Sequence, residues 1–123
     1  MTGEAYFFDS YALVELLEAN PSYETYKTKN ITCSRLNLFE TYYAILKKVG
    51  QEAADGFLNR FDGTIADIGN DVIRSAALFR WKYRERRISM TDAIGFTIAA
   101  KLGMPFLTGD RQFEDLPNVE FVR

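Results

Sequence analysis

Tyr6-Phe7-Phe8-Asp9-Ser10 opens the first structural element of this chain. The three aromatic residues form a short apolar run that Asp9 ends, and this predicts a buried strand rather than a helix. Apolar residues then recur at helical spacing through residues 10–20, and Asp9 or Ser10 can cap the helix that they predict. The chain is therefore expected to begin with a buried strand that ends in an acid and leads directly into a helix.

The same alternation of apolar runs and helical stretches continues along the chain. Further strands are predicted at residues 31–33, 64–68, 106–108 and 119–122. Helices are predicted at 34–49, at 51–61, from residue 70 onward, and at 89–103. Strands separated by helices need crossover connections, which are typical of parallel sheets. We therefore predict one α/β domain over residues 1–123, with a mostly parallel sheet and helices on both of its faces.

Composition limits the chemistry that such a domain can perform. There is no histidine among the 123 residues, which excludes histidine general bases, Ser-His-Asp triads and histidine-ligated zinc. Cys33 is the one cysteine, so no intrachain disulfide can form, and a lone thiol fits a reducing compartment. Because no targeting segment or membrane span is visible, we expect a cytoplasmic protein. Any hydrolysis must use carboxylates, hydroxyls, lysines or a bound metal.

Four acidic residues occupy positions that a parallel sheet would bring together. Asp9 and Asp110 each follow a predicted strand. Asp92 lies in the first turn of a predicted helix, and Glu40 lies in the first half of another. Strand ends and helix starts share one edge of a parallel α/β sheet, which is where such folds bind ligands. The placement predicts that the four carboxylates converge.

Each of these acids also has a simpler explanation. Asp9 can be a helix N-cap, and Asp110 can be a turn residue. Asp92 stands three residues after Ser89, as in a capping box. Glu40 can be an ordinary exposed helix residue. The prediction of a site therefore depends on the set and its common placement, not on any single acid.

A cluster of carboxylates implies a cation. Like charges close together raise one another's pKa unless a positive ion intervenes. Ligands that are all oxygen suit hard ions such as Mg²⁺ and Mn²⁺. Such an ion can activate water and stabilise charge on a phosphodiester, and it needs no histidine. A metal-dependent phosphodiesterase is therefore compatible with this composition.

Four motifs, in order along the chain, resemble those of the PIN domain family. They are Tyr6-Phe7-Phe8-Asp9-Ser10, Glu40 in its helix, Ser89-Met90-Thr91-Asp92-Ala93, and Leu107-Thr108-Gly109-Asp110-Arg111-Gln112-Phe113. The resemblance extends over residues 6–122. By size the chain is most similar to the VapC-type toxins of VapBC type II toxin–antitoxin pairs. One position departs from the pattern, because Gly109 stands where the family often has Asn.

The resemblance implies a five-stranded parallel sheet between helices, in three layers. It implies a catalytic, Mg²⁺- or Mn²⁺-binding quartet of acids: Asp9, Glu40, Asp92 and Asp110. Ser10 and Thr108 would be supporting hydroxyls. The implied activity is endonucleolytic cleavage of RNA, often tRNA or rRNA. The implied partners are the RNA substrate, a small antitoxin protein laid along an apolar groove, and a second copy of the chain in a homodimer.

An RNA substrate also requires positive charge near the site. Arg86 and Arg87 precede the helix of Asp92, and Arg111 follows Asp110. We predict RNA contacts for these three arginines. The alternative for the first two is a solvated helix end, because basic side chains favour helix C-termini.

Two other functions stay open at this point. A receiver-like phospho-signalling domain would use Asp9, Asp67 and Thr108, but it would leave Glu40 and Asp92 unexplained. A PIN-like binding scaffold that has lost catalytic activity is the second alternative, and Gly109 is the residue that favours it.

Overall fold

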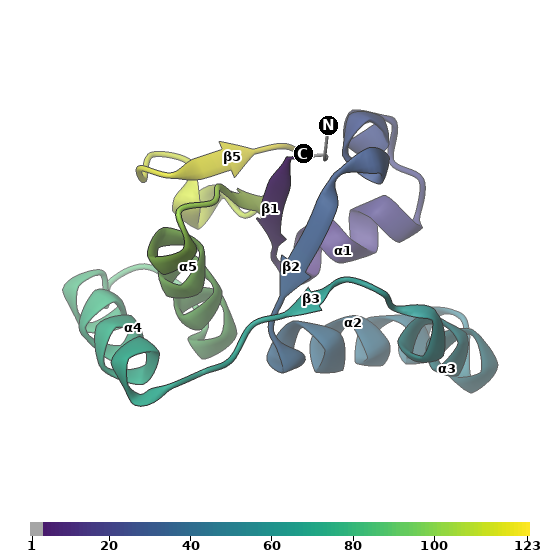
Figure 1. The fold of residues 1–123 in the computed structure, drawn as a ribbon, viewed down its shortest axis with the longest axis horizontal. Coiled ribbons are helices and arrows are strands. Elements are labelled where there is room, and N and C mark those ends of the chain that lie inside the picture. The colour runs from purple at the N-terminus through teal and green to yellow at the C-terminus, as the bar shows by residue number, and fades with distance from the viewer. Residues whose placement is uncertain (1–3) are drawn as a thin grey trace.

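The computed structural model describes residues 4–123 and contains a five-stranded sheet in the order β3-β2-β1-β4-β5 (Figure 1). Every pair of neighbouring strands is parallel. The strands are β1 (Ala5–Phe8), β2 (Asn30–Cys33), β3 (Thr64–Ile65), β4 (Phe106–Thr108) and β5 (Val119–Phe121). The predicted parallel sheet with flanking helices is therefore confirmed.

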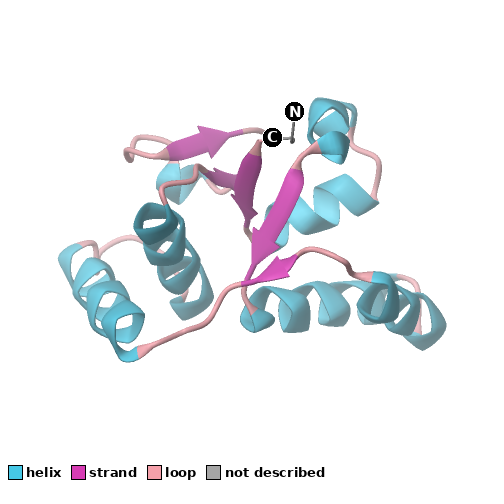
Figure 2. Ribbon diagram, viewed as in Figure 1, coloured by secondary structure: helices cyan, strands magenta, loops and turns pink. Residues whose placement is uncertain are grey.

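Helices cover both sides of the sheet (Figure 2). They are α1 (Ser10–Leu17), α2 (Arg35–Lys48), α3 (Gln51–Arg60), α4 (Asn70–Lys82) and α5 (Met90–Leu102), with short 3₁₀ helices η1 (Pro21–Thr28) and η2 (Arg111–Phe113). Both α1 and α5 pack against β1 and β4. In Figure 1, α4 lies beside α5 on one side of the molecule, and α2 and α3 lie with α1 on the other. Within residues 4–123, no helix is both long and apolar enough to cross a bilayer.

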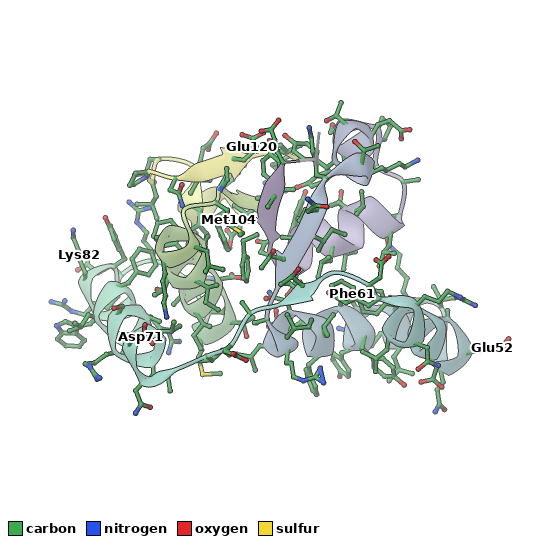
Figure 3. All side chains as sticks on the ribbon, viewed as in Figure 1. Glu52, Phe61, Asp71, Lys82, Met104 and Glu120 are labelled. Atoms are coloured by element: carbon green, nitrogen blue, oxygen red, sulfur yellow. The ribbon has the colours of Figure 1, made fainter. Side chains whose placement is uncertain are left out.

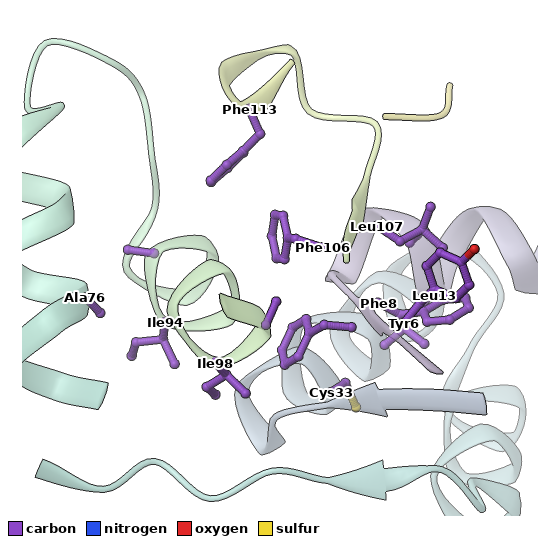
Figure 4. Packing of buried hydrophobic residues seen from close by; sticks show 14 of the residues in the cluster. Tyr6, Phe8, Leu13, Cys33, Ala76, Ile94, Ile98, Phe106, Leu107 and Phe113 are labelled. Carbon is purple, nitrogen blue, oxygen red and sulfur yellow. The ribbon is translucent and has the colours of Figure 1, made fainter. Parts of the chain in front are cut away.

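Aromatic side chains of the central strands form the core. Phe7 and Phe106 are partners in the register of β1 and β4, and their stacked rings lie 5.9 Å apart on the side that faces α5. Helix α5 approaches them closely because it has Gly95 there, where an added Cβ would lie 2.8 Å from the Phe7 ring. On the other side of the sheet, Phe8 packs near Leu13 of α1 (Figure 4). The aromatic run that predicted β1 therefore fills both faces of the sheet.

Strand β3 is shorter than the predicted 64–68. It pairs with β2 through Thr64 and Ile65, and the Ala66 amide donates one more hydrogen bond, 2.8 Å long, to the Cys33 carbonyl. The chain then leaves the sheet and runs to α4 on the other side of the molecule (Figure 1). Strand β3 is at the edge of the sheet and pairs only with β2. It therefore ends where the chain turns away from β2 toward α4.

The strand order places a ligand-binding position at the centre of the sheet. The chain passes from β1 through α1 to β2 on one side, whereas β4 pairs with β1 on the other side. The carboxyl ends of β1 and β4 therefore flank the point where the strand order reverses. Open α/β sheets bind ligands at such points. Asp9 and Asp110 lie just beyond these two strand ends.

One buried hydroxyl offers a test of this packing. Thr41 of α2 is fully buried, and within residues 4–123 its Oγ1 is the buried side-chain polar atom that lacks a hydrogen-bond partner. We expect Thr41→Val to raise the free energy of unfolding by about 1 kcal/mol, because it removes an unpaired polar group without leaving a cavity. Urea denaturation of both proteins measures the change.

Thr97→Val is the matched control. The Thr97 hydroxyl, also within a helix, donates a 2.8 Å hydrogen bond to the Ala93 carbonyl, so the same substitution removes a formed bond. This control should leave stability unchanged or lower it. A Thr41→Val protein less stable than the wild type would show that the hydroxyl is satisfied.

Candidate active site

The four predicted acids line one cavity at the carboxyl edge of the sheet. Its volume is about 440 Å³. The cavity residues are Asp9, Ser10, Tyr11, Glu40, Ser89, Asp92, Gly109, Asp110, Arg111 and Arg123. The structure thus brings together residues that follow β1, β4 and β5 and residues of α1, α2, α5 and η2. The four acids therefore lie around one cavity, as their placement along the sequence predicted.

Asp9 is the most deeply buried of these acids, with 1% of its surface exposed. It follows β1 and is the N-cap of α1, where its Oδ1 accepts a 2.8 Å hydrogen bond from the Ala12 amide. Its other carboxylate oxygen, Oδ2, accepts a hydrogen bond from the Thr108 hydroxyl at the end of β4. Both oxygens are therefore fixed, one by a helix start and the other by the neighbouring strand.

Glu40 is held by a chain of side chains that links α1 to α2. The Ser10 hydroxyl donates a 2.6 Å hydrogen bond to Glu40 Oε1, and the Asn37 amide group donates to Ser10 Oγ at 3.1 Å. Asn37 is in turn fixed by the capping box that it forms with Ser34 at the start of α2. Ser10, predicted as a supporting hydroxyl, thus orients Glu40 from the neighbouring helix.

Asp92 and Asp110 both line the cavity and both stand at the start of a helix. The Asp92 amide donates a 3.1 Å hydrogen bond to Ser89 Oγ, so Ser89 caps α5 as the sequence allowed. Asp110 caps η2, because its Oδ1 accepts from the Gln112 amide at 2.9 Å. The Asp110 amide donates to Thr108 Oγ1 at 3.0 Å. Capping and a place in the cavity are therefore not alternatives for Asp110, whereas at α5 the cap is the Ser89 hydroxyl and not the Asp92 carboxylate.

Burial and mutual repulsion raise the pKa of two of the acids. Burial is the main reason that the pKa of Asp9 rises to about 8, and the charges of Asp92 and Asp110 raise it further. The hydrogen bonds from Thr108 and Ala12 oppose this rise. Burial also raises the pKa of Asp92 to about 6, and Asp110 and Glu40 add to the effect. The cavity is thus a place where negative charge is poorly compensated by the protein itself.

The donor set of the cavity suits a hard cation. All of its acidic ligands are oxygen donors, and Cys33 is buried elsewhere, where burial raises its thiol pKa to about 12. Among residues 4–123, however, no three Asp, Glu or Cys side chains are close enough to form a ready-made ligand group. Carboxylate oxygens are nevertheless the ligands of an ion such as Mg²⁺, which keeps several of its waters and uses only one or two carboxylates directly.

The predicted basic residues divide into two groups. Arg111 lines the cavity, together with Arg123, which sequence reasoning missed. Arg86 does not line it: its guanidinium holds Asp115 through two hydrogen bonds of 2.7 and 2.9 Å and also donates to the Gln112 carbonyl. Arg87 is exposed outside the cavity. The basic end of α4 nearby, marked by Lys82, lies at the outer edge of the molecule (Figure 3). RNA contacts by Arg86 and Arg87 remain predictions.

Three cavity or supporting residues escaped sequence reasoning. Asn37 could have been found, because it stands one helical turn before Glu40 on the same face of α2. Tyr11 and Arg123 carry no such local signal. They meet across nearly the whole length of the chain, with the Arg123 guanidinium 6.0 Å from the centre of the Tyr11 ring. Asp67, the residue required by a receiver-like site, is not among the cavity residues.

Comparisons with known proteins give a family and a fold. The PIN domain family model matches residues 6–119. One similar solved structure is a toxin–antitoxin complex from Klebsiella pneumoniae, with 18% identity, 94% of this chain and 95% of that chain covered, and a TM-score of 0.74. Another is the sarcin-ricin loop cleaving toxin VapC20 of Mycobacterium tuberculosis, with 20% identity, coverage of 96% and 99%, and a TM-score of 0.75.

A third similar structure is VapBC2 of Rickettsia felis bound to a DNA fragment from its promoter. It has 18% identity, coverage of 97% of this chain and 99% of that chain, and a TM-score of 0.73. At these levels of identity the likeness establishes the fold. No curated protein matches this sequence closely enough to count as a relative.

The raised acid pKa values predict how stability depends on pH. The folded protein keeps a proton on Asp9 up to about pH 8, whereas an unfolded aspartate releases it near 3.8. The folded state therefore binds more protons in this range, and the free energy of unfolding should fall as pH rises from 5 to 8. The slope due to Asp9 should be at most about 1.4 kcal/mol per pH unit. Asp92 should add to it at the acidic end.

This slope can be measured without interference, because the chain has no histidine to titrate between pH 5 and 8. Denaturation in EDTA at several pH values gives the wild-type slope, and Asp9→Asn should make it shallower and raise stability at pH 8. Asp67→Asn, an exposed aspartate outside the cavity, is the control and should keep the wild-type slope. An unchanged slope in Asp9→Asn would contradict the assignment of a raised pKa to this residue.

Proposed function

The chain belongs to the PIN domain family, and from this we propose that it is a metal-dependent endoribonuclease, the toxin of a type II toxin–antitoxin pair. The observation that carries the proposal is the convergence of Asp9, Glu40, Asp92 and Asp110 on one cavity. The receiver-like alternative loses its basis for two reasons. It would need Asp67 in the site, but Asp67 does not line the cavity, and the chain belongs to the PIN domain family rather than to a receiver family.

One or two of the four acids would hold Mg²⁺ or Mn²⁺ directly, and the others would act through waters bound to the ion. Bound there, the ion would supply an activated water and stabilise charge on the phosphodiester. Thr108 and Ser10 keep the carboxylates of Asp9 and Glu40 in fixed orientations through their hydrogen bonds. A carboxylate with a fixed orientation needs no reorganisation during the reaction, which is the general advantage of a preorganised site.

The substrate would enter beside the arginines of the cavity. Arg111 and Arg123 stand on the same cavity as the acids, and a guanidinium matches the geometry of a phosphate group. They would offset the repulsion between the carboxylates and the RNA backbone. We propose a structured RNA, either rRNA or tRNA, as the substrate; the sarcin-ricin loop that one similar toxin cleaves is an RNA of this kind.

RNA cleavage by purified protein tests the proposal. We expect total RNA to be cleaved in Mg²⁺ or Mn²⁺ and to remain intact in EDTA. Asp9→Asn and Asp110→Asn should each lower the rate by about a hundredfold or more, because each removes a charged ligand from the proposed site. Asp67→Asn makes the same chemical change outside the cavity and should cleave at the wild-type rate.

A second measurement separates loss of activity from loss of metal. Mn²⁺ should raise the unfolding temperature of the wild type and of Asp67→Asn, but should raise that of Asp110→Asn much less, because an ion that binds only the folded state stabilises it. Cleavage that survives in EDTA would overturn the metal-dependent mechanism. A folded wild-type protein that neither binds Mn²⁺ nor cleaves RNA would favour the inactive scaffold.

The same proposal includes protein partners. An apolar groove of about 850 Å³ lies between α1, α2 and α3, away from the acids. Its apolar wall includes Leu17, Ile45 and Phe57, and charged residues of both signs also line it: Glu15, Glu18, Lys47, Lys48 and Arg60. We assign this groove to the small antitoxin, which would offer an apolar segment. A homodimer would cover other exposed apolar residues, such as Leu78 and Trp81 of α4.

A charge placed in the groove should weaken this complex. Leu17 is 51% exposed, so Leu17→Glu should fold normally yet lower the affinity for the proposed antitoxin by about tenfold or more. Leu102→Glu is the matched control, since Leu102 is 49% exposed and outside the groove. Calorimetry measures both affinities. If Leu17→Glu and Leu102→Glu bind the antitoxin equally well, this groove is not the antitoxin site.

A further inference from the structure

Gly109 stands at a position where a side chain has no room. A Cβ built on it would lie 2.2 Å from Cε1 and 2.5 Å from Cζ of the Tyr11 ring, and 2.6 Å from the Val122 carbonyl oxygen. The space that a side chain at position 109 would need is therefore taken by the ring of Tyr11. Gly109 and Tyr11 are therefore complementary: because Gly109 has no side chain, the large Tyr11 ring fits beside it.

The Tyr11 ring is held beside the acids from two directions. Tyr11 is in the first turn of α1, two residues after Asp9. The buried Tyr23 ring contacts it, with centres 6.4 Å apart and planes at 50°, and the Arg123 guanidinium lies 6.0 Å from its centre. Tyr11 itself is only half-buried and lines the same cavity as the four acids. An anchored aromatic surface thus forms part of the wall of the proposed active site.

The chemistry of this wall matches a nucleotide. An aromatic ring offers an apolar plane on which any nucleobase can stack, and stacked bases are a common feature of single-strand recognition. Arg111, on the same cavity, offers a guanidinium that matches a phosphate next to such a base. Tyr11 is half-buried and lines the acidic cavity, whereas Tyr23 is fully covered.

We propose that Tyr11 is a specificity-determining residue, on which an unpaired nucleobase of the substrate stacks next to the phosphate that is cleaved. This inference rests on the proposed ribonuclease function and adds a residue that contacts a base to the proposed site. A base can stack on Tyr11 only when it is outside a duplex.

Fluorescence of 2-aminopurine tests the stacking directly. The probes are single-stranded RNA oligonucleotides that carry one 2-aminopurine at successive positions, because the fluorescence of this base falls when it stacks. We expect quenching at one position next to the cleaved bond, in the wild type and in Tyr11→Phe, and little quenching in Tyr11→Leu. Tyr11→Leu keeps an apolar side chain but no aromatic plane, and thermal unfolding checks that it is folded.

Kinetics provide the second measurement. Tyr11→Leu should raise KM by about tenfold to a hundredfold while kcat changes by less than about threefold, and Tyr11→Phe should restore KM. The wild type should also cleave an oligonucleotide less efficiently when a complementary strand pairs the stacked base, and Tyr11→Leu should lose this preference.

The outcomes separate this inference from the proposed function. If Tyr11→Leu binds, quenches and cleaves like the wild type, while Asp9→Asn remains inactive, the stacking role is wrong and the ribonuclease stands. A folded Tyr11→Leu with a lower kcat and an unchanged KM would likewise overturn stacking, because it would show that Tyr11 positions the acids instead. If the wild type neither binds nor cleaves any RNA, the proposed function fails and the stacking role fails with it.

Discussion

The buried carboxylate of Asp9 is the constraint on which the rest of the cavity depends. A carboxylate that is 1% exposed must be hydrogen-bonded or it destabilises the fold. Its two oxygens find their donors on the first turn of α1 and on Thr108 of β4, so the end of β1 is tied to both neighbours. The helix that follows then places Ser10 against Glu40 of α2. One buried acid thus sets the relative positions of a strand, two helices and the neighbouring strand end.

Helix starts explain how the fold tolerates several acids in one place. Asp9 and Asp110 cap α1 and η2, and Asp92 stands in the first turn of α5. Free amide groups at helix N-termini stabilise negative charge, so each acid is partly compensated by the backbone of its own element. The raised pKa of Asp9 and Asp92 shows that the compensation is incomplete. The structural role of each acid and its proposed catalytic role have the same physical origin.

The parts of this structure that could be predicted are those with a local cause. The aromatic run at β1 predicted a buried strand, and parallel topology predicted that Asp9 and Asp110 share an edge. The early end of β3 could not be predicted, because it depends on where α4 lies rather than on residues 64–68. Arg86 is a similar case: its sequence context suggested a free basic side chain, but a contact with distant Asp115 engages it. In both cases, a contact between segments far apart in sequence made the structure differ from the prediction.

Gly109 shows why a departure from a motif should be considered together with its surroundings. Taken alone, a glycine between Thr108 and Asp110 indicates a looser turn and suggests that the site has decayed. In the structure, the Thr108 hydroxyl still accepts a hydrogen bond from the Asp110 amide, and Tyr11 fills the space that a side chain at 109 would occupy. The wall of the cavity beside the acids therefore includes an aromatic ring, while the hydrogen bond between Thr108 and Asp110 is kept. The residues that line a cavity decide what it recognises, and one scaffold can serve different substrates in this way.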